Sequence, residues 1–95
     1  MPDSTYKLIT KEEISKLHFP KEEILKSETL IKKREESIHR AISLGNLEHQ
    51  KVTIYFSDNL GNKQVETTIW AVTDSAIVLK QNTILPINRI HKLEI

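Results

Sequence analysis

The chain has 95 residues, with 14 basic and 13 acidic side chains and a net charge of +1. It contains no cysteine, which excludes a disulfide framework, thiol chemistry and cysteine-ligated zinc. The near-neutral balance gives no chain-wide electrostatic footprint for nucleic acid, although it leaves room for a local basic patch. This length predicts a single domain over residues 1–95.

Two features bear on location. No apolar run approaches the roughly 20 residues that a membrane span needs. The first ten residues, MPDSTYKLIT, lack the apolar core of a secretion signal. We therefore expect a protein of the cytoplasm with no membrane contact.

Residues 1–46 are expected to form a loose N-terminus and a helical arm. Residues 1–9 carry little pattern and are expected to be only locally ordered. Thr10 and Glu13 have the spacing of a capping box, in which the glutamate side chain reaches back to the first backbone N–H of the helix. This spacing predicts a short helix that continues through Leu17.

The second part of the arm carries a longer helical pattern. Pro20 suits the first turn of a helix, and the periodicity favours helix within residues 20–44, as one helix or as two. Gly45 predicts its C-terminal end. The apolar stripe is narrow, so the helix needs packing against other elements. We expect it to lie across the open end or the wall of the following strands, near Ile69, Trp70 and Ala71.

Residues 47–95 predict a small barrel. In residues 51–57, apolar and polar side chains alternate, as in a strand with one buried face. The polar turn at residues 58–62 leads into a run, residues 63–72, that is long enough to bend and pair twice. Further strands are expected at residues 76–80, 83–85 and 90–95, joined by a turn at 73–75, a two-residue connection at Gln81–Asn82 and a 3₁₀ corner at 86–89.

This pattern predicts an α+β fold, with N-terminal helices followed by a five-stranded antiparallel SH3-like (Sm-like) small barrel. A sheet this small is more stable when it curls on itself than when both faces meet water. The expected core of the barrel is Val52, Ile54, Phe56, Ile77, Leu79, Ile84, Ile90 and Leu93.

No catalytic, cofactor or metal site is predicted. Glu36 and His39 have the Glu-x-x-His spacing of di-iron bundles, but those sites need further pairs on further helices. These two residues are therefore interpreted as a solvated helix face. The only glycines are Gly45 and Gly61, so there is no glycine-rich phosphate loop. We expect no enzyme activity.

The predicted binding surface combines basic and aromatic side chains of the strands. A basic face with one aromatic suits single-stranded nucleic acid in principle, and the alternative is that these residues are solvated outer positions of the strands. Trp70 is either a core or helix-packing residue or an exposed binding anchor. The candidate residues are Lys51, Tyr55, Trp70, Lys80, Arg89 and Lys92.

The order of one helix and five strands, with the segments VTDSAIVLK and ILPINRIHKLEI, resembles the Sm-like fold, including the bacterial RNA chaperones of that type. This resemblance implies a small barrel and single-stranded RNA as a partner. The chain departs from that pattern at Thr68, where Sm-like proteins usually carry glycine. It departs again at Ile87 and Asn88, near the place of the Lys-His pair that contacts RNA. No RNA-binding residue is therefore transferred.

A longer run, from LGNLEHQKVTIYFSD to ILPINRIHKLEI, resembles a family of short uncharacterised bacterial proteins with no assigned activity. With no catalytic set in the sequence, the leading hypothesis is a non-catalytic module that binds a protein or peptide. The alternative is an Sm-like protein that binds single-stranded RNA. The oligomeric state is left open.

Overall fold

The computed structural model describes residues 5–48 and 50–95, and they form an α+β fold. The longest helix precedes most of the strands, as expected. In chain order the elements are β1 (Lys7–Leu8), α1 (Lys11–Ile14), α2 (Glu28–Glu48), β2 (Val52–Ser57), β3 (Asn62–Thr67), β4 (Ile69–Val72), β5 (Ala76–Leu79), the 3₁₀ turn η1 (Lys80–Asn82), β6 (Thr83–Pro86), the 3₁₀ turn η2 (Ile87–Arg89) and β7 (Ile90–Glu94).

The strands form two sheets. The four-stranded sheet has the order β1-β3-β2-β7 and the three-stranded sheet has the order β4-β5-β6. The long run in the middle of the chain bends at Thr68: β3 pairs with β2, whereas β4 pairs with β5. The prediction that this run bends and serves two pairings is therefore confirmed.

The closed five-stranded barrel is not confirmed. Among the described residues no ladder joins β6 to β7, so the strands remain two sheets. Pro86 ends β6 without a backbone N–H to donate, and η2 then turns the chain before β7 begins. The number of strands also exceeds five, because the bend splits one run and β1 adds another.

Strand β1 corrects the expectation of a loose N-terminus and of purely antiparallel pairing. It runs parallel to β3, with Lys7 opposite Lys63, and the N–H of Ile9 donates to the carbonyl of Gln64 at 3.0 Å. Ile9 is buried. Two paired residues are too few to show a periodic pattern in a sequence, and residues 1–4 lie outside the described part of the chain.

Seven of the eight expected core residues are buried, and the exception shows a shift in register. Ile84 is 61% exposed, and Leu85 is fully buried in its place. The connection between β5 and β6 has three residues, Lys80–Asn82, so that Leu79 pairs with Thr83. A two-residue connection would have paired Lys80 with Thr83. The one-residue difference turns every side chain of β6 to the opposite face.

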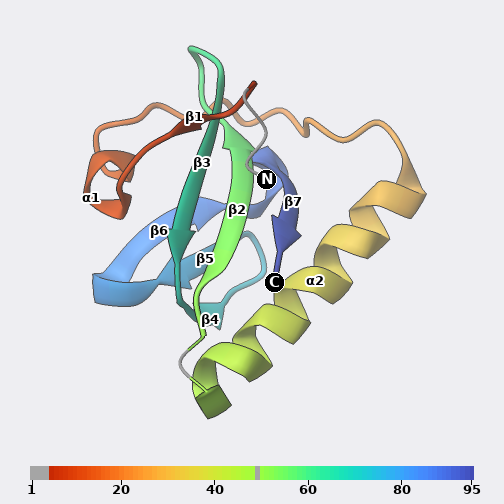
Figure 1. Cartoon of the computed structure of the whole chain (residues 1–95). Coiled ribbons are helices and arrows are strands. Elements are labelled where there is room, and N and C mark those ends of the chain that lie inside the picture. The colour runs from red at the N-terminus through yellow and green to blue at the C-terminus, as the bar shows by residue number, and fades with distance from the viewer. Residues whose placement is uncertain (1–4, 49) are drawn as a thin grey trace.

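Helix α2 packs along one side of the strands and contacts β4 and β7 (Figure 1). It begins at Glu28 and continues past Gly45 to Glu48, so residues 20–27 are not helical and Gly45 is not the stop. Glycine inside a helix costs only about 1 kcal/mol, which helix packing can offset. Ile38 and Ala41 face the core, and the contact with β4 is the predicted one.

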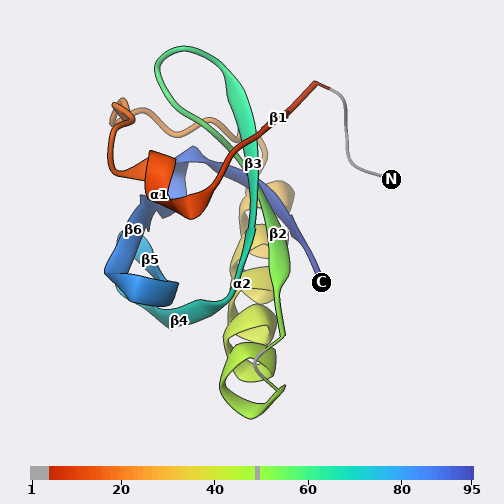
Figure 2. The same cartoon turned by 60° about the vertical axis from the view of Figure 1, so that its left-hand side comes forward.

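The segment between α1 and α2, residues 15–27, crosses over one end of the strands. Helix α1 ends at Ile14, earlier than expected, and lies close to β6 (Figure 2). The Thr10 N–H donates to the Glu13 carboxylate at 2.8 Å, as the capping box predicts. From α1 the chain passes over the strands to reach α2 (Figure 1). This crossing segment forms one wall of the candidate site.

Candidate functional site

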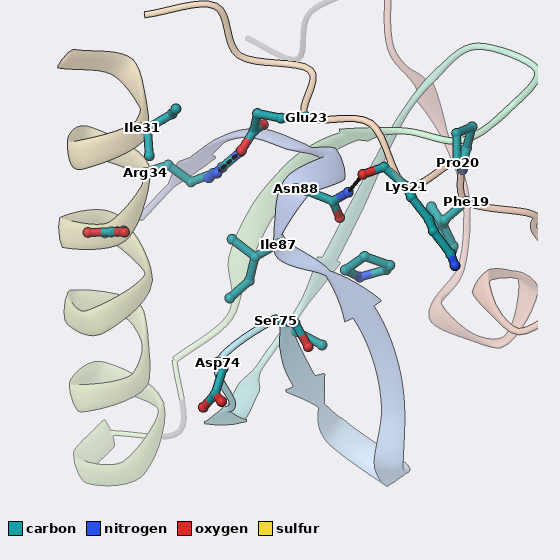
Figure 3. A pocket seen from close by; sticks show the side chains of 13 residues that line it. Phe19, Pro20, Lys21, Glu23, Ile31, Arg34, Asp74, Ser75, Ile87 and Asn88 are labelled. Atoms are coloured by element: carbon teal, nitrogen blue, oxygen red, sulfur yellow. Dashed lines mark hydrogen bonds and ion pairs between the residues drawn. The ribbon is translucent and has the colours of Figure 1, made fainter. Parts of the chain in front are cut away.

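A groove of about 720 Å³ opens where three parts of the chain meet. The first two are the crossing segment and the first half of α2. The third consists of the corner at residues 86–89, which contains η2, and the adjoining turn between β4 and β5 (Figure 3). Its apolar lining comes from all three parts and consists of Phe19, Pro20, Ile31, Ala76, Pro86 and Ile87. The side chain of Ile87 projects from the corner toward α2 (Figure 3).

Hydrogen bonds from η2 fix the crossing segment in place. The Asn88 amide donates to the carbonyl of Lys21 at 2.6 Å, and the Asn88 carbonyl accepts from the N–H of Ile24 at 3.1 Å. The Arg89 guanidinium donates to the carbonyl of Glu22 at 2.9 Å. Because an irregular segment has no ladder of its own, these bonds satisfy backbone groups that would otherwise need water.

The ion pair between Glu23 and Arg34 ties the same segment to α2. Two guanidinium nitrogens of Arg34 donate to the two carboxylate oxygens of Glu23, at 2.8 and 2.5 Å, and one also donates to the carbonyl of Ile90 at 3.0 Å. Arg34 is only 4% exposed. The hydrogen bonds from Arg34 hold the pKa of Glu23 below its usual value. Arg34, which interrupts the apolar stripe of the helix, is thus a structural residue of the groove.

The corner is joined to the turn between β4 and β5. The N–H of Ile87 donates to the carbonyl of Ser75 at 2.9 Å. The Thr73 hydroxyl accepts from the N–H groups of Ser75 and Ala76 and holds the turn in shape. The crossing segment is therefore hydrogen-bonded to both α2 and η2, and η2 is hydrogen-bonded to the β4–β5 turn.

Two carboxylates stand where the groove continues into a smaller hollow of about 280 Å³. Glu35 from α2 and Asp74 from the β4–β5 turn line both spaces, and so does Ile87. Glu35 and Asp74 are exposed, and neither forms an ion pair with any residue in the described ranges. The groove is therefore apolar at its centre and acidic at one end.

The predicted binding surface is not assembled as one face. Lys51, Lys80 and Lys92 are exposed, as expected, but Lys80 lies at the β5–β6 connection and Lys51 precedes β2. Tyr55 and Lys92 lie close together, because they are register partners on β2 and β7. The lysine ammonium lies 4.9 Å from the centre of the tyrosine ring.

Two candidates of that surface are buried, which corrects their assignment to solvent-facing positions. Tyr55 is 1% exposed, because Tyr6 of the N-terminal segment packs edge-on against its ring at 4.9 Å. Arg89 is 9% exposed and donates to carbonyls of Ser57 and Glu22. A period-two pattern assigns Tyr55 to the outer face correctly but cannot show that a distant segment covers that face.

Trp70 is 46% exposed, which is intermediate between a buried packing residue and a fully exposed binding anchor. It stands where the register of β4 against β5 is irregular, between Ile69 and Ala71. It does not line the groove. Its role as a binding anchor stays a prediction.

The groove itself was not predicted. Its residues come from three distant parts of the chain and are common apolar, polar and charged types. The signals that could have indicated it are the Phe19-Pro20 pair, in which the proline disfavours helical geometry at Phe19, and the proline corner at residues 86–89. Pro20 was interpreted as the first turn of a helix and residues 86–89 as a 3₁₀ corner between two strands, and neither was interpreted as part of a binding site.

The closest approach to a catalytic pair in the described part of the chain is Ser57 and His91. The Ser57 hydroxyl lies 2.7 Å from the His91 Nε2 and 2.5 Å from the Asn62 side-chain oxygen. Burial, followed by the positive charge of Arg89, lowers the pKa of His91. Ser57 is only 7% exposed, so its hydroxyl is not presented to a substrate. The pair instead joins the ends of β2 and β7.

Neither a cluster of metal ligands nor a membrane-spanning helix occurs among the described residues. Within residues 5–48 and 50–95, no three His, Asp or Glu side chains gather to hold a metal ion. None of the helices in the same ranges has the length and apolar character to cross a bilayer.

No known protein family, curated protein or solved structure matches this chain. The resemblances to Sm-like proteins and to a family of short bacterial proteins therefore stay predictions.

Proposed function

We propose that this protein is a non-catalytic module that holds a peptide segment of a protein partner in the groove between the crossing segment, α2 and η2. The observation that carries the proposal is a groove whose three walls are already fixed by hydrogen bonds and an ion pair. Binding sites for small ligands and short segments are usually pre-formed, largely apolar and about 300–1,000 Å³ in volume. The groove, at about 720 Å³, has these properties.

Pre-formed walls also favour affinity. A site that must order loops on binding loses part of its interaction free energy to that ordering. Here the crossing segment is held by bonds from Asn88, Arg89 and Arg34, so little further order is needed. This supports recognition of a segment over a purely structural role for the groove.

We further propose that the strands form an opened small barrel of the SH3-like type. The bend at Thr68, by which one run joins both sheets, supports this interpretation. A fold of this type is compatible with many functions, so the proposed docking function rests on the groove alone.

The test places a bulky side chain in the groove. A phage-displayed library of random 12-residue peptides is panned on the full chain, and recovered peptides are measured by fluorescence polarisation. Ser75 lines the groove and is exposed, so Ser75→Trp should obstruct the groove without unfolding the chain and should weaken binding at least tenfold. Ser43→Trp makes the same change at an exposed position of α2 outside the groove lining and should leave binding unchanged.

Location is checked by amide chemical-shift mapping with a recovered peptide. The largest shifts are expected near Lys21, Ile31, Ser75 and Ile87. Shifts concentrated near Lys92 and Tyr55 instead, or equal binding by the two tryptophan variants, would refute docking in the groove.

Binding of single-stranded nucleic acid is the alternative and has less support, because Tyr55 and Arg89 are engaged within the fold. Phosphate contacts make such binding fall steeply with salt. Fluorescence anisotropy with labelled 20-nucleotide oligo(U) and oligo(dT) at 25 mM and 300 mM NaCl tests it. Absence of binding at the lower salt concentration removes this alternative.

A further inference from the structure

The acidic end of the groove indicates which chemical groups its occupant carries. Glu35 and Asp74 approach the same junction from two different elements, with the side chain of Ile87 between the two spaces they line. No ion pair neutralises either carboxylate within the described ranges. Two unpaired carboxylates beside apolar surface attract a cation whose stem is itself apolar.

The other charged groups of the groove do not cancel this field. Glu23 and Arg34 neutralise each other through their bidentate ion pair. Lys21 lines the main groove but not the smaller hollow, and it lies across the groove from Asp74 (Figure 3). His39 lines the hollow and is exposed. The junction therefore carries a local excess of negative charge, while the main groove remains apolar.

The apolar surface beside this junction favours a peptide segment over a free ion. Phe19, Ile31, Pro86 and Ile87 line the main groove. A metal ion or a free amine makes no use of this apolar surface, whereas a peptide segment carries a cationic and an apolar side chain together.

We propose, building on the docking function above, that the partner segment carries a lysine or arginine next to a bulky apolar residue. The cationic head lies between Glu35 and Asp74, and its alkyl stem covers Ile87. The apolar neighbour fills the centre of the main groove, near Ile31 and Pro86. Arginine satisfies two carboxylates better than lysine, because its planar guanidinium presents several N–H donors.

The test uses the 12-residue phage library with the wild type, with Glu35→Gln/Asp74→Asn, and with Glu36→Gln/Glu66→Gln. The last variant is a matched control, because it removes the same charge at two exposed positions outside the groove lining. Peptides recovered on the wild type should be enriched in lysine or arginine within about four residues of leucine, phenylalanine or tryptophan. The dissociation constant should rise about fivefold in the groove variant and less than twofold in the control.

The contribution of charge to peptide affinity should also depend on the salt concentration and on the charge of the peptide. At 500 mM NaCl the difference between the two double variants should shrink, because exposed charge pairs are screened. Replacing the peptide's arginine by citrulline should reproduce the effect of the groove variant.

Each outcome separates the two proposals. Peptides that lose binding in Ser75→Trp but bind Glu35→Gln/Asp74→Asn as the wild type does would overturn the cationic occupant and leave the docking function standing. Recovery of no peptide sensitive to Ser75→Trp would overturn the docking function itself, and the cationic occupant with it.

Discussion

The ion pair between Glu23 and Arg34 gives the sharpest test of how the groove is held together. Arg34 is 4% exposed and Glu23 has a side chain 34% exposed. Glu23→Gln removes the counter-charge and leaves the guanidinium buried, which costs about 3–5 kcal/mol for a fully buried pair. Since water reaches one third of Glu23, we expect about 2 kcal/mol of lost unfolding free energy.

Arg34→Met keeps most of the packing of the aliphatic stem but removes three hydrogen bonds, one of them to the carbonyl of Ile90. We expect it to cost about 1.5 kcal/mol, because Glu23 can turn toward water. The double variant should cost about the same as Arg34→Met alone, since the neutral amide that replaces the Glu23 carboxylate no longer faces a buried charge. The coupling free energy is then about 2 kcal/mol.

The assay is urea unfolding at 25 °C and pH 7, followed by far-UV circular dichroism and by the fluorescence of Trp70. For a chain of this size, about 2 kcal/mol moves the midpoint by about 1–2 M urea. Glu12→Gln, which breaks the exposed ion pair with Lys11, is the control and should not shift the midpoint measurably. A coupling below about 0.5 kcal/mol would refute the claim that this pair fixes the crossing segment.

The same pair sets an expected pH dependence. The pKa of Glu23 in the folded chain lies below its ordinary value of 4.5, because Arg34 stabilises the carboxylate. The contribution of the Glu23 carboxylate to the free energy of unfolding is therefore complete above pH 4.5. It is lost as the pH falls through the pKa of Glu23 in the folded chain. The coupling measured at pH 3.5 should be smaller than the coupling at pH 7, and an equal or larger value would contradict the assigned charge states.

Leu85→Ala should cost about 2–5 kcal/mol of unfolding free energy and Ile84→Thr less than about 0.5 kcal/mol, and the reverse order in urea unfolding would contradict the register of β6. Asn82 has a φ of 62°, so Asn82→Ala should destabilise the chain by about 1 kcal/mol while Asn82→Gly stays within about 0.5 kcal/mol of the wild type. Because burial lowers the pKa of His91 below 6.5, folding stability should rise with pH between that lowered pKa and 6.5, and His91→Gln should remove this part of the urea-measured pH profile.

Local patterns in the sequence correctly predicted the features that depend on residues close together in the chain. The alternation in β2 placed Val52, Ile54 and Phe56 in the core, and all three are buried. The length of the run that became β3 and β4 predicted a strand shared by two pairings. In contrast, the face of β6 depended on whether the preceding connection had two residues or three. Gln81 and Asn82 both adopt positive φ, and their sequence alone does not reveal that Lys80 belongs to the same turn.

The features that the sequence did not show depend on contacts between distant residues. Tyr55 occupies an outer position of β2, yet Tyr6 covers it from a segment almost fifty residues earlier. Arginine is usually a surface residue, but Arg89 finds its hydrogen-bond acceptors in two separate backbone segments, near Ser57 and Glu22. Residue type and spacing contain no information about such partners, so the binding surface predicted from basic and aromatic residues included residues that the fold itself uses.

The separation of β6 from β7 and the groove have one physical cause, which is the corner at residues 86–89. Proline cannot donate to a ladder, and η2 then turns the chain, so β6 and β7 do not pair among the described residues. The same turn frees Asn88 and Arg89 to bind the carbonyls of the crossing segment. It also directs the side chain of Ile87 toward α2 (Figure 3). A groove at this position is therefore the structural consequence of leaving β6 and β7 unpaired, and residues of the same corner contribute to the groove walls.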